Sequence, residues 1–183
     1  MAMWAERLIS ELDAADERAR KLAGGLGVEQ LNWQPANGGW SVGQCLEHLC
    51  IANEVYLPAI ARGLEGKPKR PVKKITPGLF GRWFIESFIE PSAKQKKTPA
   101  PKKIVPSSRV ETSVLERFLA SNNATREVIR RAREYDVNQI RFRNPLVSVI
   151  WFTVGTGLMI ISGHERRHLL QAERVRAAEG FPG

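Results

Sequence analysis

Apolar residues recur every three or four positions along several stretches of this chain, which is the period of an amphipathic helix. In residues 3–23 the apolar positions include Trp4, Leu8 and Leu12, and a Gly-Gly pair follows the last of them. Glycine just past the last apolar turn is a common helix stop. The spacing therefore predicts a first helix over residues 3–23.

Capping residues indicate where the next two helices begin. Ser41 and Gln44 have the spacing of a capping box, in which a hydroxyl and a returning amide satisfy free N–H groups. The apolar pattern after them predicts a helix over residues 41–61. Ser108 and Glu111 have the same spacing, so we expect a third helix to begin at residue 107 or 108 and to end near residue 135.

A fourth helix is predicted over residues 153–179, where Gly180 and Pro182 end the pattern. The chain has no internal repeat and no convincing strand pattern. Four helices of about 20 residues or more, each about 30 Å long, favour a four-helix bundle. The expected fold class is therefore all-α, in one domain over residues 1–183.

Residues 62–107, between the second and third predicted helices, differ in composition from the rest. They hold seven of the 11 prolines. They also hold 12 of the 28 Lys and Arg residues but only three of the 19 Asp and Glu residues, so this segment carries the whole net charge of +9. A connection this long is unusual in a compact domain and is often functional or mobile. We therefore expect a long basic insertion in the bundle.

A short amphipathic stretch, residues 78–90, lies in the middle of this insertion. It is open to three interpretations: a helix packed on the main body, a lid over a site, or a basic-flanked helix on a membrane surface. The large apolar residues expected on one side of it are Leu79, Phe80, Trp83, Phe84 and Phe88.

Three further patterns bear on location. Residues 145–163 carry no charge and approach the roughly 20 residues of a membrane-spanning helix. Glycines and threonines interrupt them, and charged sequence follows at once, so we expect a buried helix and no membrane span. The N-terminal residues lack the apolar region of a signal peptide. Cys45 and Cys50 are expected on different faces of one helix, as reduced thiols, which favours a cytoplasmic setting.

The chain has only three histidines, and their placement points to chemistry. His164 and His168 lie four residues apart, so one helix presents both on one face with their Cβ atoms about 6 Å apart. Two imidazoles at this spacing can bind one ion. His48 lies in the apolar stripe of the second predicted helix. Three separate interior histidines are the alternative, but because all three fall on core faces we expect a common metal site.

A Trp-Ser turn at residues 40–41 opens the helix that carries His48, and an H-x-x-x-H pair followed by Gln171 lies in the last predicted helix. In the order, spacing and helix placement of these motifs the chain resembles the DinB/YfiT-like superfamily, whose members are expected to be metalloenzymes. The resemblance runs from residue 31 to the C-terminal helix. The basic insertion departs from the family's short connection, which leaves the substrate class open.

The resemblance implies an up-down-down-up bundle, often dimeric, in which His48, His164 and His168 hold a divalent metal ion such as nickel, zinc or iron. Three protein ligands leave an open coordination position, as in catalytic zinc-type sites. Relatives include transferases and isomerases that use bacillithiol or mycothiol. The resemblance therefore suggests activation of a low-molecular-weight thiol as one model of the chemistry.

Four residues near the histidines are weaker candidates. Gln171 could orient a ligand or a bound water, or make an ordinary core hydrogen bond. Cys45, one turn before His48, could be a soft fourth ligand, although a small buried thiol fits better. Glu47 and Glu165 could act as acid or base, but each lies one position off the ligand face. We expect both to be surface carboxylates.

The leading functional hypothesis is a metal-dependent hydrolase or thiol transferase that acts on a small molecule. A second is a binding protein that uses the Lys-rich residues 67–103 on nucleic acid or anionic lipid. Because charged loops are more often simply solvated, we do not expect a nucleic-acid partner. A third is a non-catalytic metal-binding protein.

Overall fold

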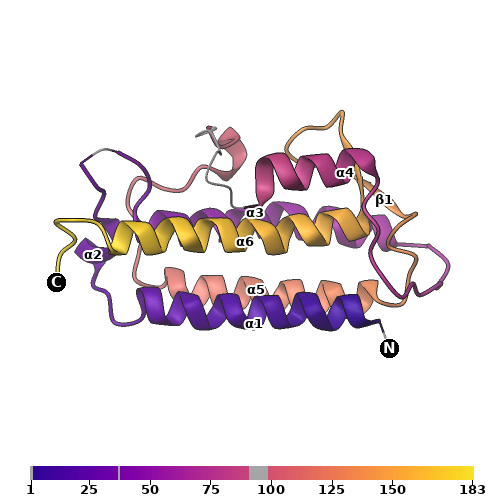
Figure 1. The fold of residues 1–183 in the computed structure, drawn as a ribbon, viewed down its shortest axis with the longest axis horizontal. Coiled ribbons are helices and arrows are strands. Elements are labelled where there is room, and N and C mark those ends of the chain that lie inside the picture. The colour runs from indigo at the N-terminus through magenta and orange to yellow at the C-terminus, as the bar shows by residue number, and fades with distance from the viewer. Residues whose placement is uncertain (1, 37, 91–98) are drawn as a thin grey trace.

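The computed structural model describes residues 2–36, 38–90 and 99–183, and four long helices dominate it. Figure 1 shows them side by side, with the N-terminus at one end of the bundle and the C-terminus at the other. The long helices are α1 (Met3–Ala23), α3 (Val42–Leu64), α5 (Val114–Ala132) and α6 (Val154–Arg176). The predicted first, second and fourth helices agree with α1, α3 and α6 to within a few residues at each end.

The long helices are ordered up-down-down-up. Helices α1 and α6 run in one direction, and α3 and α5 run in the other (Figure 1). Both α1 and α3 pack against both α5 and α6. Helices α3 and α5 follow each other among the long helices and run in the same direction. The chain between them must therefore return along the whole bundle, which explains the long insertion. The predicted all-α four-helix bundle is confirmed.

Two apolar clusters fill the bundle, one at each end. The first includes Leu8 and Leu158, and the second includes Leu46 and Leu169, all of them almost fully buried. Each such leucine contributes about 1.5–3 kcal/mol to folding. The second cluster also contains Cys45 and Cys50 as free thiols, so these cysteines form no disulfide with each other.

A buried polar network joins the four long helices between these clusters. The Asn122 side-chain amide donates to Asp16 at 2.7 Å and to Glu165 at 3.3 Å. Arg126 also donates to Asp16, at 2.7 Å, and Asn53 donates to Glu165 at 3.4 Å. Glu165 is only 1% exposed, so its assignment to the surface was wrong. Because α6 packs on two helices and is covered by the insertion, nearly its whole circumference is buried.

The insertion covers α6 with a short helix. Helix α4 (Leu79–Phe84) continues into one turn of π-helix, η1 (Ile85–Ile89), which packs on α6 (Figure 1). The inward residues are Ile85 and Ile89, whereas Leu79 is 91% exposed and Trp83 is 52% exposed. The predicted apolar side of this stretch is therefore largely the outer one. Three of the predicted basic residues, Lys94, Lys96 and Lys97, lie outside the described residues.

The third long helix begins later than predicted. After a short 3-10 turn, η2 (Lys102–Ile104), the chain stays non-helical until Val114, and no capping box forms at Ser108. Hydrogen bonds to neighbouring helices hold this stretch. The Ser107 N–H donates to Glu47 at 2.7 Å, and the Val110 N–H donates to Asn32 at 2.7 Å. Backbone groups used in this way are not available for a helix.

A small hairpin joins α5 to α6, and the sequence did not predict it. Strands β1 (Arg141–Arg143) and β2 (Trp151–Thr153) pair antiparallel, with Phe142 opposite Phe152. Both phenylalanines are buried. The apolar residues 145–163 thus divide between this hairpin and α6. Among the described residues, no helix is long and apolar enough to cross a membrane.

Candidate metal centre

The position of His48 is fixed by the N-terminus of α3. The Gln44 N–H donates to the Ser41 hydroxyl at 3.1 Å, and the Ser41 N–H donates to the Gln44 side chain at 3.0 Å. The predicted capping box is therefore present. The short helix α2 (Val28–Asn32) packs beside it. One turn after this cap His48 points toward α6, which runs antiparallel to α3 and presents His164 and His168.

The three histidines meet in space. The Nε2 atoms of His48 and His164 lie 3.1 Å apart. The ring of His168 lies 4.5 Å from that of His48 and 4.6 Å from that of His164, between centroids. Each ring offers a nitrogen within 4.8 Å of the other two. Tetrahedral ligands at about 2.0–2.1 Å from a zinc-sized ion are roughly 3.3 Å apart, so this donor set fits such an ion with small adjustments.

Hydrogen bonds at the other ring nitrogens orient two of the imidazoles. Nδ1 of His48 lies 2.6 Å from the Ile104 carbonyl oxygen, and Nδ1 of His168 lies 3.0 Å from the Gln171 side-chain oxygen. Since both partners are acceptors, each Nδ1 carries the proton and each Nε2 keeps a free lone pair. Gln171 and the Ile104 carbonyl thus act as orienting groups.

Electrostatics favour the neutral form of all three rings. Burial, helped by the nearby Arg167 cation, lowers the pKa of His48 to about 4 and that of His168 to about 3. Burial and the two neighbouring imidazoles lower the pKa of His164 well below its ordinary value. Neutral imidazole is the form that binds a metal ion, so no proton has to leave at pH 7.

The histidines face a cavity of about 910 Å³. Trp40 forms one wall, with its ring 4.5 Å from that of His48 and 5.6 Å from that of His168. Of the described residues that line the cavity, none is Asp or Glu. Opposite the histidines the walls come from η1, from residues 99–104 and from the hairpin loop. The packing of η1 on α6 agrees with the first interpretation of residues 78–90, a helix packed on the main body, and the insertion also lines part of the cavity.

The carboxylate and thiol candidates lie elsewhere. Cys45 is packed in an apolar cluster, where burial raises its thiol pKa, and it does not join the three histidines. Glu47 is buried, which corrects its assignment to the surface. It accepts hydrogen bonds from the Ser107 N–H at 2.7 Å and from Arg117 at 3.2 Å. Its role is to hold the segment before α5 against α3, a long-range contact that the periodicity of one helix does not predict.

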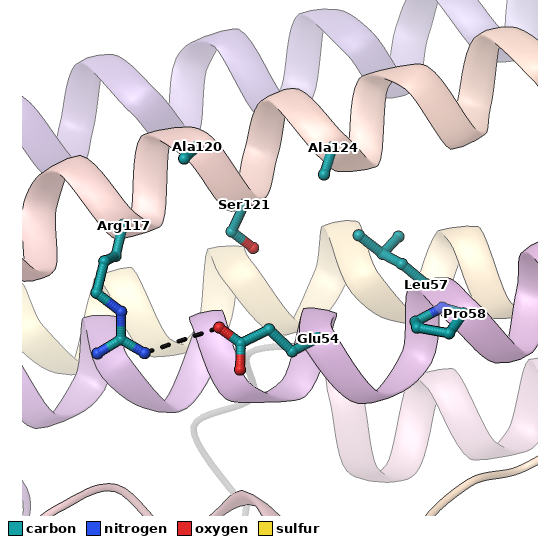
Figure 2. Close-up of a pocket in the computed structure, with 7 residues that line it drawn as sticks. All are labelled: Glu54, Leu57, Pro58, Arg117, Ala120, Ser121 and Ala124. Carbon is teal, nitrogen blue, oxygen red and sulfur yellow. Dashed lines mark ion pairs between the residues drawn. The ribbon is translucent and has the colours of Figure 1, made fainter.

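A second, more open pocket of about 440 Å³ lies between α3 and α5, away from the histidines. Figure 2 shows small side chains on α5, Ala120 and Ala124, along this pocket, with Ala124 across from Leu57 on α3. Arg117 and Glu54 form an ion pair at 3.7 Å at one end. No histidine or cysteine lines this pocket among the described residues, so it offers no metal ligands of that kind.

The sequence model of the DinB superfamily matches residues 11–172. The chain belongs to the DinB superfamily. No curated protein matches it by sequence. Among solved structures, this DinB protein is similar to YfiT from Bacillus subtilis, with a TM-score of 0.61 and 14% identity over 97% of this chain and 89% of that one. YfiT is described as a probable metal-dependent hydrolase with an unusual four-helix bundle topology. At this identity the likeness shows the fold.

Proposed function

We propose that this DinB protein is a metal-dependent enzyme that acts on a small molecule, and that His48, His164 and His168 hold its divalent ion. One observation carries the proposal: three buried or half-buried neutral imidazoles, from two helices, converge on one point in a cavity. A merely structural histidine needs one hydrogen-bond partner and has no reason to direct its second nitrogen at two other rings.

The chain's own residues prepare the site. The Ile104 carbonyl and Gln171 hold His48 and His168 with Nε2 directed inward. Trp40 and η1 limit access of water from two sides. A divalent ion held by His48, His164 and His168 would have room for a further ligand, and it would supply the lowering of the pKa of a bound water or thiol, or the polarisation of a carbonyl group.

Hydrolysis is the reaction that we favour. It is supported by the description of YfiT, with which this chain shares its fold, as a probable metal-dependent hydrolase. The cavity, at about 910 Å³, falls in the size range of small-molecule sites. Transfer to or from a low-molecular-weight thiol is the second reaction to test, because the same open position suits a thiolate.

The decisive experiment is metal analysis by elemental mass spectrometry on protein purified without a histidine tag. We expect about one divalent ion per chain in the wild type and little in His48→Asn, with Gln139→Ala, an exposed change far from the site, as the control. Circular dichroism shows whether each variant is folded. Metal-free wild-type protein that takes up no nickel, zinc or iron on addition would contradict the proposal.

A further inference from the structure

Arg167 lies in the same turn of α6 as the metal-site histidines and lines the cavity that they face. It is half-buried, and one of its N–H groups donates to the backbone carbonyl of Phe88 in η1. A guanidinium group has five N–H donors, so this contact uses only one of them. It leaves a strong, bidentate donor beside His164 and His168.

Among the residues that the structure describes, no carboxylate balances the charge of Arg167. Its neighbour Arg166, by contrast, contacts Glu11 at 2.6 Å and also Glu90. In the described part of the chain no carboxylate lies within 4.0 Å of Arg167, and residues 91–98 contain no Asp or Glu in their sequence. A half-buried cation without a counter-charge is costly, unless a ligand supplies the anion.

A second cation continues the same face of α6. Arg174, which is exposed, lies seven residues, or two turns, beyond Arg167 and lines the same cavity, and among the described residues it has no carboxylate within ion-pair distance. With no acid on the described lining, this end of the cavity is positive. Such a site attracts anions and disfavours cations.

Apolar side chains line the part of the cavity next to α4 and η1. One turn before His164, α6 contributes Ile160 and Ile161, and η1 with the end of α4 contributes Phe84, Phe88 and Ile89. Along α6 the order is therefore Ile160 and Ile161, then the two histidines with Arg167 between them, and then Arg174. A compound that fills the cavity meets the apolar side chains of α4 and η1 with the Arg167 guanidinium beside them, and Arg174 farther along α6.

We propose that the substrate of this site is an amphipathic organic anion, with an apolar chain or ring against α4 and η1 and a carboxylate or phosphate bound by Arg167. This inference rests on the proposed function, because it names the class of compound on which the histidine site acts. The planar guanidinium matches both kinds of anion in two parallel hydrogen bonds. Arg174 adds a second cation at the outer end.

The test separates charge recognition from packing with two fluorescent probes of one shape. The first is 1-anilinonaphthalene-8-sulfonate, an anion with an apolar body, and the second is N-phenyl-1-naphthylamine, which has the same body without the charge. Arg167→Gln removes the cation but keeps an N–H donor for the Phe88 carbonyl. Arg20→Gln, an exposed change on α1, is the matched control for loss of one positive charge.

We expect Arg167→Gln to weaken binding of the anionic probe about tenfold or more and to leave that of the neutral probe within about twofold. Arg20→Gln is expected to change neither. Decanoate or decyl phosphate should displace the anionic probe from wild-type protein, whereas decanol should not, and the tighter competitor identifies the preferred anion. The inference would be overturned if Arg167→Gln weakened binding of both probes equally or left binding of the anionic probe unchanged. It would also be overturned if the wild-type protein did not bind the anionic probe.

The titrations are made on metal-free protein and repeated after zinc addition. The metal analysis tests only whether the histidines bind an ion. The probe titration of the metal-free protein tests only whether Arg167 binds the anion. A failure of one is therefore distinguishable from a failure of the other.

Discussion

Nδ1 of His48 lies 2.6 Å from the carbonyl oxygen of Ile104, so the backbone of η2 determines which nitrogen of His48 faces His164. The contact joins α3 to the last part of the insertion, across 56 residues of sequence. It means that the insertion, which returns along the bundle between the parallel helices α3 and α5, takes part in building the site.

This contact predicts different stabilities for two variants that both lack the ligand nitrogen. In His48→Asn the side-chain amide takes about the place of Nδ1 and can still donate to the Ile104 carbonyl, whereas His48→Ala leaves this buried acceptor unsatisfied. We expect the alanine variant to be less stable by about 1–3 kcal/mol, measured by urea unfolding with chelator present. Equal stabilities would mean that the hydrogen bond does not form in solution.

Gln171 is expected to tune metal affinity through His168, to which it is hydrogen bonded at 3.0 Å. Replacing a group that orients a ligand typically weakens metal binding about 10–100-fold. Gln171→Ala should therefore lose zinc to a competing chelator at correspondingly lower chelator concentration. Gln139→Ala, on the exposed turn after α5, should behave like the wild type; equal affinities in all three proteins would argue against an orienting role.

Metal addition should raise the thermal stability of the protein. An ion that binds only the folded state, at a concentration about 100 times its Kd, adds about 2.7 kcal/mol, or roughly 5–11 °C in Tm for a chain of this size. Scanning calorimetry with zinc or nickel checks this, and His168→Ala should show no shift. Magnesium, which prefers oxygen ligands, is the negative control.

The buried ion pair between Arg126 and Asp16 should contribute more to the free energy of unfolding than an exposed ion pair on α5. Arg126→Met leaves Asp16 buried without its cation, and we expect a loss of about 3–5 kcal/mol in unfolding free energy. Arg130→Met removes the exposed pair with Glu127 one turn later and should cost less than about 1 kcal/mol. Similar losses in chemical unfolding of the two variants would contradict this description of the network.

Gly157 lies where α6 passes the hairpin, and a side chain at this position should destabilise the fold. A Cβ atom at this position would lie 2.6 Å from the ring of Phe142, which is itself buried. Gly157→Ala is therefore expected to lose about 1–3 kcal/mol, despite the better helix propensity of alanine. Gly78→Ala, with open space around its Cβ, should be nearly neutral. Calorimetry of the two variants checks the difference.

Local sequence signals predicted most of the helices. The apolar period and the Ser41–Gln44 box lie within single helices, so α1, α3 and α6 could be placed from neighbouring residues alone. The late start of α5 and the hairpin could not, because both depend on distant contacts, such as Val110 with Asn32 and Phe142 with the end of α3. Strands of three residues are too short to show an alternating pattern.

The site was predicted in part. Composition and spacing single out the three histidines, which do lie together, and that they hold a metal ion stays a prediction. The burial of Glu47 and Glu165 was missed, because a helical wheel assumes one buried face whereas α3 and α6 each pack on several neighbours. Arg167 was missed for a related reason: its importance depends on its position in the cavity and on the absence of carboxylates around it in the described part of the chain, which only the folded arrangement shows.

The pair formed by His48 and His164 spans 116 residues of sequence. A chain that is still being synthesised, with α6 unfinished, has no second helix to complete the cluster. No isolated segment can gather the three imidazoles. If an ion binds as proposed, its full set of three donors exists only once α3 and α6 have packed together, so tight binding depends on closure of the bundle.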